Sequence, residues 1–237
     1  MRKLLAKSAD RGLLYLEEHT LHVVQAVEFF AAAYGVPLDV ARNGAILHDL
    51  GKGHPTFQAM LIHKDTSQQE QWLQQLAGGE AIRQALRCRD LGKIPIHRHE
   101  YSSLAFLPLF PREQWPLLID MVVAHHKSIV GDKSGRGLLD LLDGGDDEIF
   151  IEDHLEYFDD WAPAAEEVAN HFGVPLVGMD RAMAEQALDF VLEYVDALPN
   201  DWSPARGLLM TADHFASNYK YETPKKTAEL FKIPNTT

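Results

Sequence analysis

Apolar residues recur with the period of an α-helix along most of this chain. In "LLYLEEHTLHVVQAVEFFAAAYG", the apolar positions fall near helical spacing and the segment stops at Gly35. Strand-type alternation of apolar and polar residues is nearly absent. We therefore expect one all-α domain, a helical bundle. The expected helices cover residues 13–35, 37–52, 55–79, 80–92, from about 99 onward, 111–130, 163–173, 178–199 and 203–221.

One internal segment and the C-terminal end depart from this pattern. Residues 131–160 combine several glycines with a strongly acidic run, which is typical of a surface loop with little order of its own. We expect an acidic loop insertion around 131–160. Residues 224–237 are polar and contain proline. We interpret them as a tail or linker, so that the domain itself would cover residues 1–223.

Composition limits the classes of function. The hydrophobic content of 46% is enough for a sizeable core, and the longest apolar runs are too short to cross a bilayer, which takes roughly 20 residues. The single cysteine, Cys88, excludes an internal disulfide and a thiolate metal cluster, and no signal peptide is recognisable, so a cytoplasmic protein is expected. A net charge of −13 argues against general binding to phosphate backbones. Metal ions or a partner would have to supply positive charge to a polyanionic substrate.

Several histidines and aspartates stand inside otherwise apolar helical segments, as in "AILHD", "MVVAHH" and "LLMTAD". Burying a carboxylate costs several kcal/mol unless it is paired or bound to metal. Convergence of such residues on one or two divalent cations would offset that cost, and imidazole with carboxylate suits first-row transition metals. A bridging Asp49 could hold two ions about 4 Å apart. The candidate ligands are His19, His48, Asp49, His99, His125, His126 and Asp213.

Each of these residues alone has a more ordinary interpretation. A His-Asp pair is usually a polar helix end, and a lone histidine is usually a satisfied core or boundary residue. The order of all of them, on predicted helices, favours a metal site. Among the other histidines, His97 competes with His99 as a ligand, and His22 is either an outer neighbour of the site or a boundary residue. Residues expected at the surface are His54, His63, His154 and His171.

The motifs together resemble a known family. "LEEHTLHVVQ", "ILHDLGKGHPTFQ", "HRHEYSS", "VVAHHKS" and "TADHFAS" are similar to motifs of the HD superfamily of metal-dependent phosphohydrolases, and specifically to the HD nuclease domain of type I CRISPR systems. The resemblance runs from about residue 15 to 220. The family usually has a glycine after the paired histidines, where this chain has Lys127.

The resemblance implies an HD-domain helical bundle and a two-metal nuclease that cuts single-stranded DNA in CRISPR interference. Its expected partners are a superfamily 2 helicase and the surveillance complex, with no membrane involved. The expected metals are Mn, Ni, Co or Fe, with Mg possible. Asp49 would be catalytic as the bridge, and Lys52 would support the scissile phosphate. One ion would take His19, His48, Asp49 and Asp213, and the other Asp49, His99, His125 and His126.

Two other functions remain open at this point. The first is an HD phosphohydrolase that acts on nucleotides or cyclic nucleotides, because some cyclic-dinucleotide hydrolases have a similar second ligand set. The second is a non-catalytic helical scaffold whose histidines are structural. An assay of nucleotides against single-stranded DNA separates the first from a nuclease, and metal analysis separates the second.

Overall fold

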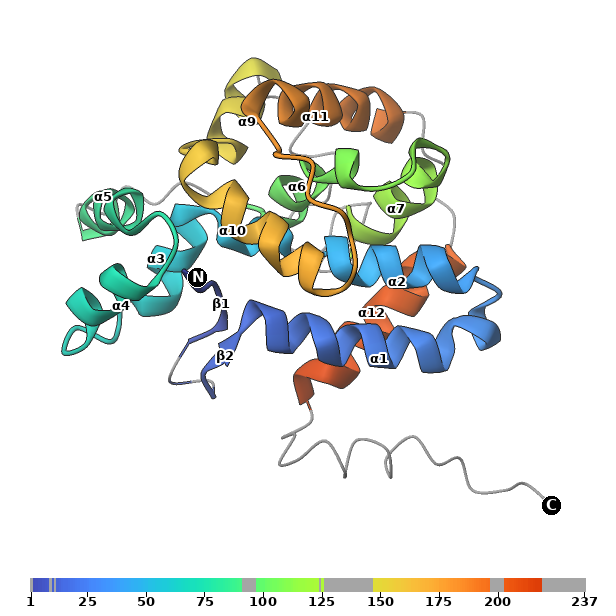
Figure 1. Cartoon of the computed structure of the whole chain (residues 1–237), viewed down its shortest axis with the longest axis horizontal. Helices are drawn as coiled ribbons and strands as arrows, with labels where there is room; N and C mark the ends of the chain where they lie inside the picture. Colours follow the sequence, from blue (N-terminus) through green and yellow to red (C-terminus); the bar gives the residue numbers. More distant parts are fainter. Residues whose placement is uncertain are drawn as a thin grey trace, which may run out of the picture.

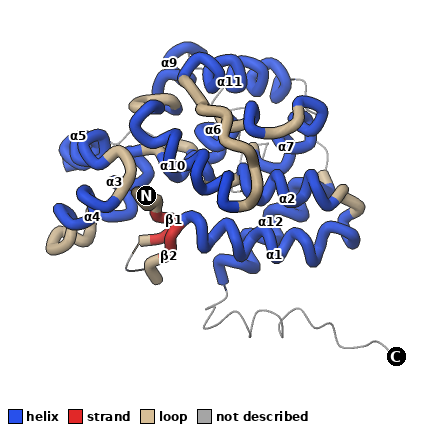
Figure 2. The backbone as a smooth tube through the Cα atoms, in the orientation of Figure 1, coloured by secondary structure: helices blue, strands red, loops and turns tan. Residues whose placement is uncertain are grey.

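A computed structural model describes residues 2–8, 10, 12–90, 97–123, 125, 147–196 and 203–218. The predicted all-α fold is confirmed: helices make up almost all of the regular structure in these residues (Figures 1 and 2). Within the same residues, none of the helices is long and apolar enough to cross a membrane. The prediction of a tail at 224–237, the ligand candidate His126 and the part of the acidic segment before residue 147 lie outside the described residues.

Four helices pack against one another at the centre of the molecule. α1 contacts both α2 and α12, and α7 contacts α2 and α12. α1 ends where the sequence predicts, because Gly35 adopts a left-handed conformation (φ 68°) that suits glycine and closes the helix. The central helices are α1 (Leu16–Tyr34), α2 (Leu38–Leu47), α7 (Trp115–Val122) and α12 (Pro204–Asn218).

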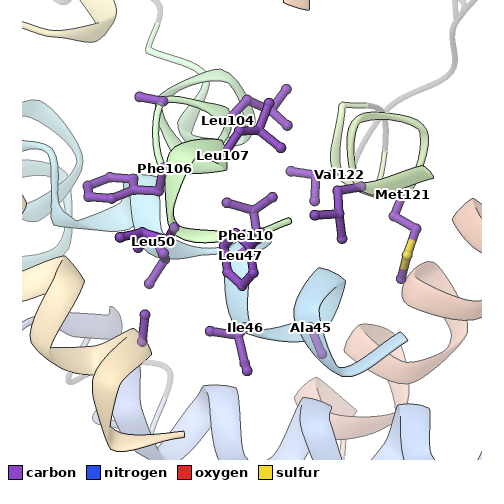
Figure 3. Close-up of a cluster of buried hydrophobic side chains, with 14 of the residues drawn as sticks. Ala45, Ile46, Leu47, Leu50, Leu104, Phe106, Leu107, Phe110, Met121 and Val122 are labelled. Atoms are coloured by element: carbon purple, nitrogen blue, oxygen red, sulfur yellow. The ribbon is translucent and has the colours of Figure 1, made fainter. Parts of the chain in front are cut away.

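The apolar core continues from this bundle into a second layer of helices. Side chains of α2, α7 and the segment after α6 meet in the buried cluster of Figure 3. The aromatic ring of Trp161 on α10 is fully buried against Phe106 and Phe158. In Figure 1, α11 lies on the far side of the molecule from α1. The layer consists of α6 (His99–Leu104), α9 (Asp147–His154), α10 (Phe158–His171) and α11 (Arg181–Asp196), with short 3-10 turns at Leu107–Leu109 and Arg112–Gln114.

A smaller lobe lies at one side of the bundle and has its own apolar cluster. It contains α3 (Pro55–Ile62), α4 (Gln69–Gln75) and α5 (Gly79–Asp90). Leu5 of a short N-terminal hairpin inserts into this cluster, and the Gln58 amide on α3 bonds both the N–H and the C=O of Leu5. The hairpin pairs β1 (Leu5–Lys7) with β2 (Leu14–Tyr15) in antiparallel fashion.

Three sequence-based predictions need correction. Residues 147–160 are not loop, because they form α9 and the start of α10, where Leu155 and Phe158 are buried. The expected helix over 55–79 is divided into α3 and α4, since Asp65 caps a turn and accepts hydrogen bonds from Ser67 and from the Trp72 indole. The expected helix over 37–52 ends at Leu47 and continues as the 3-10 turn η2 (Leu50–Gly53).

Candidate metal centre

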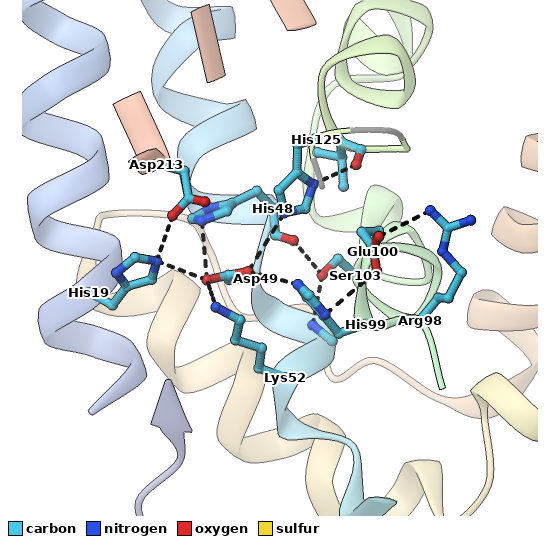
Figure 4. Close-up of polar contacts among 12 residues, drawn as sticks. His19, His48, Asp49, Lys52, Arg98, His99, Glu100, Ser103, His125 and Asp213 are labelled. Carbon is cyan, nitrogen blue, oxygen red and sulfur yellow. Dashed lines mark hydrogen bonds and ion pairs between the residues drawn. The ribbon is translucent and has the colours of Figure 1, made fainter. Parts of the chain in front are cut away.

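Residues from five separate parts of the chain converge on the carboxylate of Asp49 (Figure 4). Asp49 lies between α2 and η2, and its carboxylate is fully buried. His19 comes from the first turn of α1, His99 opens α6 and His125 follows α7, so long-range packing is what brings them together. Asp213 reaches the same place from α12.

Close packing of a glycine fixes the turn that carries Asp49. A Cβ atom at Gly51 would lie 2.1 Å from the backbone oxygen of His99, so only glycine allows η2 to approach α6 this closely. The Ser103 hydroxyl donates to the His48 carbonyl (2.8 Å) and accepts from the Gly51 N–H (2.9 Å). This approach ends α2 before Asp49, which explains why the predicted longer helix is wrong.

The two oxygens of Asp49 face different histidines. Oδ2 lies 3.0 Å from Nε2 of His19 and 3.2 Å from Nε2 of His48. Oδ1 lies 3.2 Å from Nε2 of His99 and 3.9 Å from Nε2 of His125. Asp49 therefore belongs to two groups of three potential ligands, one with His19 and His48 and the other with His99 and His125. Within each group, the ligand atoms lie within 4.8 Å of one another. Asp213 Oδ1 adds a further oxygen 3.2 Å from Nε2 of His19.

Hydrogen bonds to carbonyl oxygens fix the orientation of two of these imidazoles. Nδ1 of His48 lies 2.6 Å from the Ala45 oxygen, and Nδ1 of His125 lies 2.6 Å from the Val122 oxygen. A carbonyl oxygen can only accept, so Nδ1 carries the proton in both rings. In the neutral rings, Nε2 then directs a lone pair toward the anionic Asp49. Such an arrangement is favourable only with a cation between the two groups, and this donor set fits a divalent metal ion.

The electrostatics of the cluster favour the ligand form of the acid. Burial works to raise the pKa of Asp49, but the surrounding imidazoles, His48 first among them, and the ammonium of Lys52 outweigh it and hold the pKa well below its usual range. Burial lowers the pKa of His48, so that ring stays neutral. Burial works the same way on His19 and His125, but their hydrogen bonds to the carboxylates outweigh it and raise the pKa of both. Protons therefore compete with metal at these two positions.

Lys52 lies beside the candidate metal ligands and contacts Asp49. Its ammonium is 2.5 Å from Asp49 Oδ2, and only 8% of the residue is exposed. Because α2 ends at Leu47, Lys52 does not share a helical face with His48, and the 3-10 turn instead directs Lys52 to Asp49, three positions before it.

Arg98 and Glu100 lie behind His99, and the sequence analysis did not single them out. Glu100 Oε2 is 3.5 Å from Nδ1 of His99, and Glu100 Oε1 accepts a hydrogen bond of 3.1 Å from Arg98. All three residues are buried. Burial works to raise the pKa of Glu100, but the charges of His99 and Arg98 outweigh it and lower that pKa to about 2, so the carboxylate is anionic. Their only sequence signal is adjacency to His99 in "RHEY".

Three other histidines form a separate group, which we call the stacked cluster: His54, His97 and His154. The His54 and His97 rings stack at 4.0 Å between centroids, and His97 and His154 are 5.2 Å apart. The surface prediction is wrong for His54 and His154, which are 1% and 3% exposed. Of the two competing histidines, His99 therefore lies at Asp49 and His97 belongs to the stacked cluster.

The remaining histidines are less buried. The surface prediction is confirmed for the exposed His171, which pairs with Glu17, whereas His63 is half-buried beside the end of α3. His22 is also half-buried, one turn after His19 on α1.

Comparison with known proteins identifies a family. A model of the protein family described as "Cas3, HD domain" matches residues 37–221, which is most of the chain and includes Asp49, His99, His125 and Asp213. No curated protein and no solved structure matches. His19 lies before the matched residues, and the structure nonetheless brings it to Asp49. The chain therefore belongs to the Cas3 HD-domain family, a family of metal-dependent nucleases of type I CRISPR systems.

Proposed function

We propose that this domain hydrolyses phosphodiester bonds of single-stranded DNA at a centre of two divalent metal ions. The observation that carries the proposal is the pair of ligand groups that share Asp49. A carboxylate that presents one oxygen to each group suits two ions held about 4 Å apart, the arrangement used for in-line displacement at phosphorus. His126 lies outside the described residues and stays a predicted ligand of the second ion.

The chain's own residues would divide the work in this site. Asp49 would bridge the ions, with His19, His48 and Asp213 on one side and His99 and His125 on the other. Ions held there would add positive charge beside the phosphate and make water acidic enough to act as a nucleophile near neutral pH. Lys52 would turn from Asp49 to a phosphate oxygen, because the ions would take over its neutralising role.

The donor set and the family membership also support more specific proposals. Nitrogen-rich ligands favour Mn, Ni, Co or Fe over Mg. A chain with net charge −13 is a poor collector of DNA from solution. We therefore propose that a superfamily 2 helicase and the CRISPR surveillance complex deliver the strand to this domain in the cytoplasm.

A substrate comparison tests the proposal. Purified protein would be supplied in turn with Mn²⁺, Ni²⁺, Co²⁺ or Mg²⁺ and given single-stranded DNA, a duplex of the same sequence, nucleoside triphosphates or a cyclic dinucleotide. We expect cleavage of the single strand, with the duplex and the nucleotides largely intact. Hydrolysis of the nucleotides with the single strand intact would instead support the alternative, an HD phosphohydrolase of nucleotides.

The matched variants are Asp49→Asn and Asp189→Asn. Asp189 lies exposed on α11, so its substitution repeats the chemical change away from the site. We expect Asp49→Asn to lower DNA cleavage by more than about 1,000-fold, since both ions lose their shared ligand. Asp189→Asn should cut like the wild type. Cleavage by a pure Asp49→Asn preparation at a comparable rate would end the proposal.

A further inference from the structure

A cleft of about 610 Å³ opens beside the metal centre. Lys52 and His99 are part of its wall, so the cleft is continuous with the site. The rest of the wall comes from β1 and the residues after it, from α3 and from the end of α12. Its size leaves room for more of a substrate than one phosphate group.

Positive charge gathers in this cleft although the chain as a whole is acidic. Lys7, Lys52 and Lys64 all contribute to the wall, and Asp10 is the carboxylate that lines it. Lys64 and Asp10 lie 3.7 Å apart with side chains 68% and 51% exposed, so solvent screens this pair and it holds Lys64 only weakly. The local balance favours an anionic ligand.

Lys7 is the lysine best placed for that ligand. Its ammonium donates one hydrogen bond of 3.1 Å to the Ser217 carbonyl at the end of α12. An ammonium has three donors, so the bond to Ser217 fixes its position and leaves capacity for a phosphate. Lys7 and Lys52 both line the cleft. Burial lowers the pKa of Lys7 and the charge of Lys52 lowers it further, although Asp213 and Asp49 act in the opposite direction. A phosphate oxygen between the two lysines would relieve their repulsion.

The aromatic side chain of Phe57 lines the same cleft. Phe57 of α3 is half-buried, and its ring lies 4.9 Å from the His99 ring and 5.9 Å from the Lys52 ammonium. Met60, one turn later on α3, also lines the cleft and is 43% exposed. Aromatic rings beside a basic groove bind unstacked bases with little sequence preference.

We propose that this cleft holds the nucleotide that flanks the scissile bond, with its phosphate on Lys7 and its base against Phe57. The inference rests on the proposed nuclease function and adds to it a binding site beyond the metal centre. Lys7 belongs to the N-terminal hairpin, outside the residues 37–221 that match the family. The site selects single strands, because a base must leave its stack to contact Phe57.

Lys7→Gln tests the phosphate contact, with Lys3→Gln as its control. Lys3 lies just before β1, but its ammonium sits 4.3 Å from the centre of the Tyr15 ring and the residue lines a different cleft. For Lys7→Gln we expect KM for a single-stranded oligonucleotide to rise about tenfold with kcat within about twofold. The slope of log(kcat/KM) against log[salt] should become shallower by about 0.7, the value for one lost phosphate contact to a single strand. Lys3→Gln should change neither quantity.

Phe57→Leu tests the base contact. With an ordinary oligonucleotide we expect KM to rise at least fivefold, in line with a stacking contribution of about 1–3 kcal/mol per base. With an oligonucleotide made wholly of abasic sites, the wild type and Phe57→Leu should have the same KM, because no base is present to stack. Circular dichroism of each variant checks that the helices are intact.

The outcomes separate this inference from the proposed function. If the wild type cuts single-stranded DNA and Lys7→Gln behaves like Lys3→Gln, the inference is wrong and the nuclease stands. A fall in kcat with an unchanged KM and salt slope would also overturn it, since Lys7 would then act on the metal centre. If the wild type cuts no DNA with any metal, both proposals fail.

Discussion

The protein contains two groups of histidines that look alike in the sequence, but only one of them surrounds a carboxylate. At the metal centre, four imidazoles surround the carboxylate of Asp49. In the stacked cluster, His54 and His97 lie ring against ring with an interplanar angle of 21°, and His154 lies beside them. Parallel rings present their nitrogens in separate planes, whereas the rings at Asp49 direct nitrogens to a common point. The geometry of ligation therefore exists only at the first group among the described residues.

The charge states of the two groups differ for the same reason. Burial and the charge of His154 lower the pKa of His54 to about 3, and burial lowers the pKa of His97 and His154 as well. At the metal centre, by contrast, the carboxylates reverse the effect of burial on His19 and raise its pKa. The Asp49 carboxylate is therefore what allows the histidines around it to bind a cation.

The largest effect on DNA cleavage should come from a comparison of two variants, each with one histidine of one group replaced by glutamine. His99 and His97 are two residues apart, yet they belong to different clusters. His99→Gln should lower DNA cleavage by more than about 100-fold, above the range for residues that only support a ligand. His97→Gln should keep the rate within about threefold and lower the free energy of unfolding by about 1–2 kcal/mol. Cleavage rates and urea unfolding of both variants measure this contrast. Equal losses of activity would show that the two clusters act as one.

A smaller effect, on the affinity for Mn²⁺, is expected from Glu100→Gln. The anionic Glu100 lies 3.5 Å from Nδ1 of His99 and would support that ring as a ligand, so its loss should weaken Mn²⁺ binding about tenfold. Glutamine keeps the shape and an acceptor for Arg98. The control is Glu70→Gln, because Glu70 also pairs with an arginine, Arg83, but on the surface of the small lobe. Titration calorimetry with Mn²⁺ measures both, and equal affinities would remove Glu100 from the site.

The last comparison concerns pH and the stacked cluster. His54 is neutral in the folded protein down to about pH 3, while in the unfolded chain it takes up a proton below about pH 6.5. Its contribution to stability is therefore present above pH 6.5 and is lost as pH falls toward 3, by at most about 1.4 kcal/mol per pH unit. His54→Asn retains an acceptor for the Thr56 N–H at the start of α3 and removes the titration.

Urea unfolding of the metal-free wild type and His54→Asn between pH 7 and 4.5 measures the difference. The wild type should lose stability faster than His54→Asn as the pH falls. Parallel curves would mean that His54 takes up its proton in the folded protein as easily as in the unfolded chain.

The sequence was sufficient for the fold class and for much of the site. Helical periodicity persists through the long helices, and a carboxylate or imidazole inside an apolar segment marks a buried polar site whatever the exact packing. The order of His19, the His48-Asp49 pair, His99 and Asp213 was therefore informative. His126 stays a prediction, as do the roles of all these residues in catalysis.

The rest depended on contacts between distant segments. The end of α2 is set by the approach of Gly51 to α6, which no local pattern reveals. β1 and β2 have three and two residues, too few for an alternation to stand out. His54 and His154 resemble surface residues in the sequence, and the packing of α9 and α10 buries them. Lys7 enters the cleft through its bond to α12, 210 residues later in the chain.

Titration of metal-free protein with Mn²⁺ in a calorimeter, at pH 7.5, tests the central claim most directly. The account predicts two ions per chain for the wild type and for Asp189→Asn, and the loss of tight binding in Asp49→Asn. The same stoichiometry and affinity in Asp49→Asn, or a wild type that binds no Mn²⁺, would contradict it.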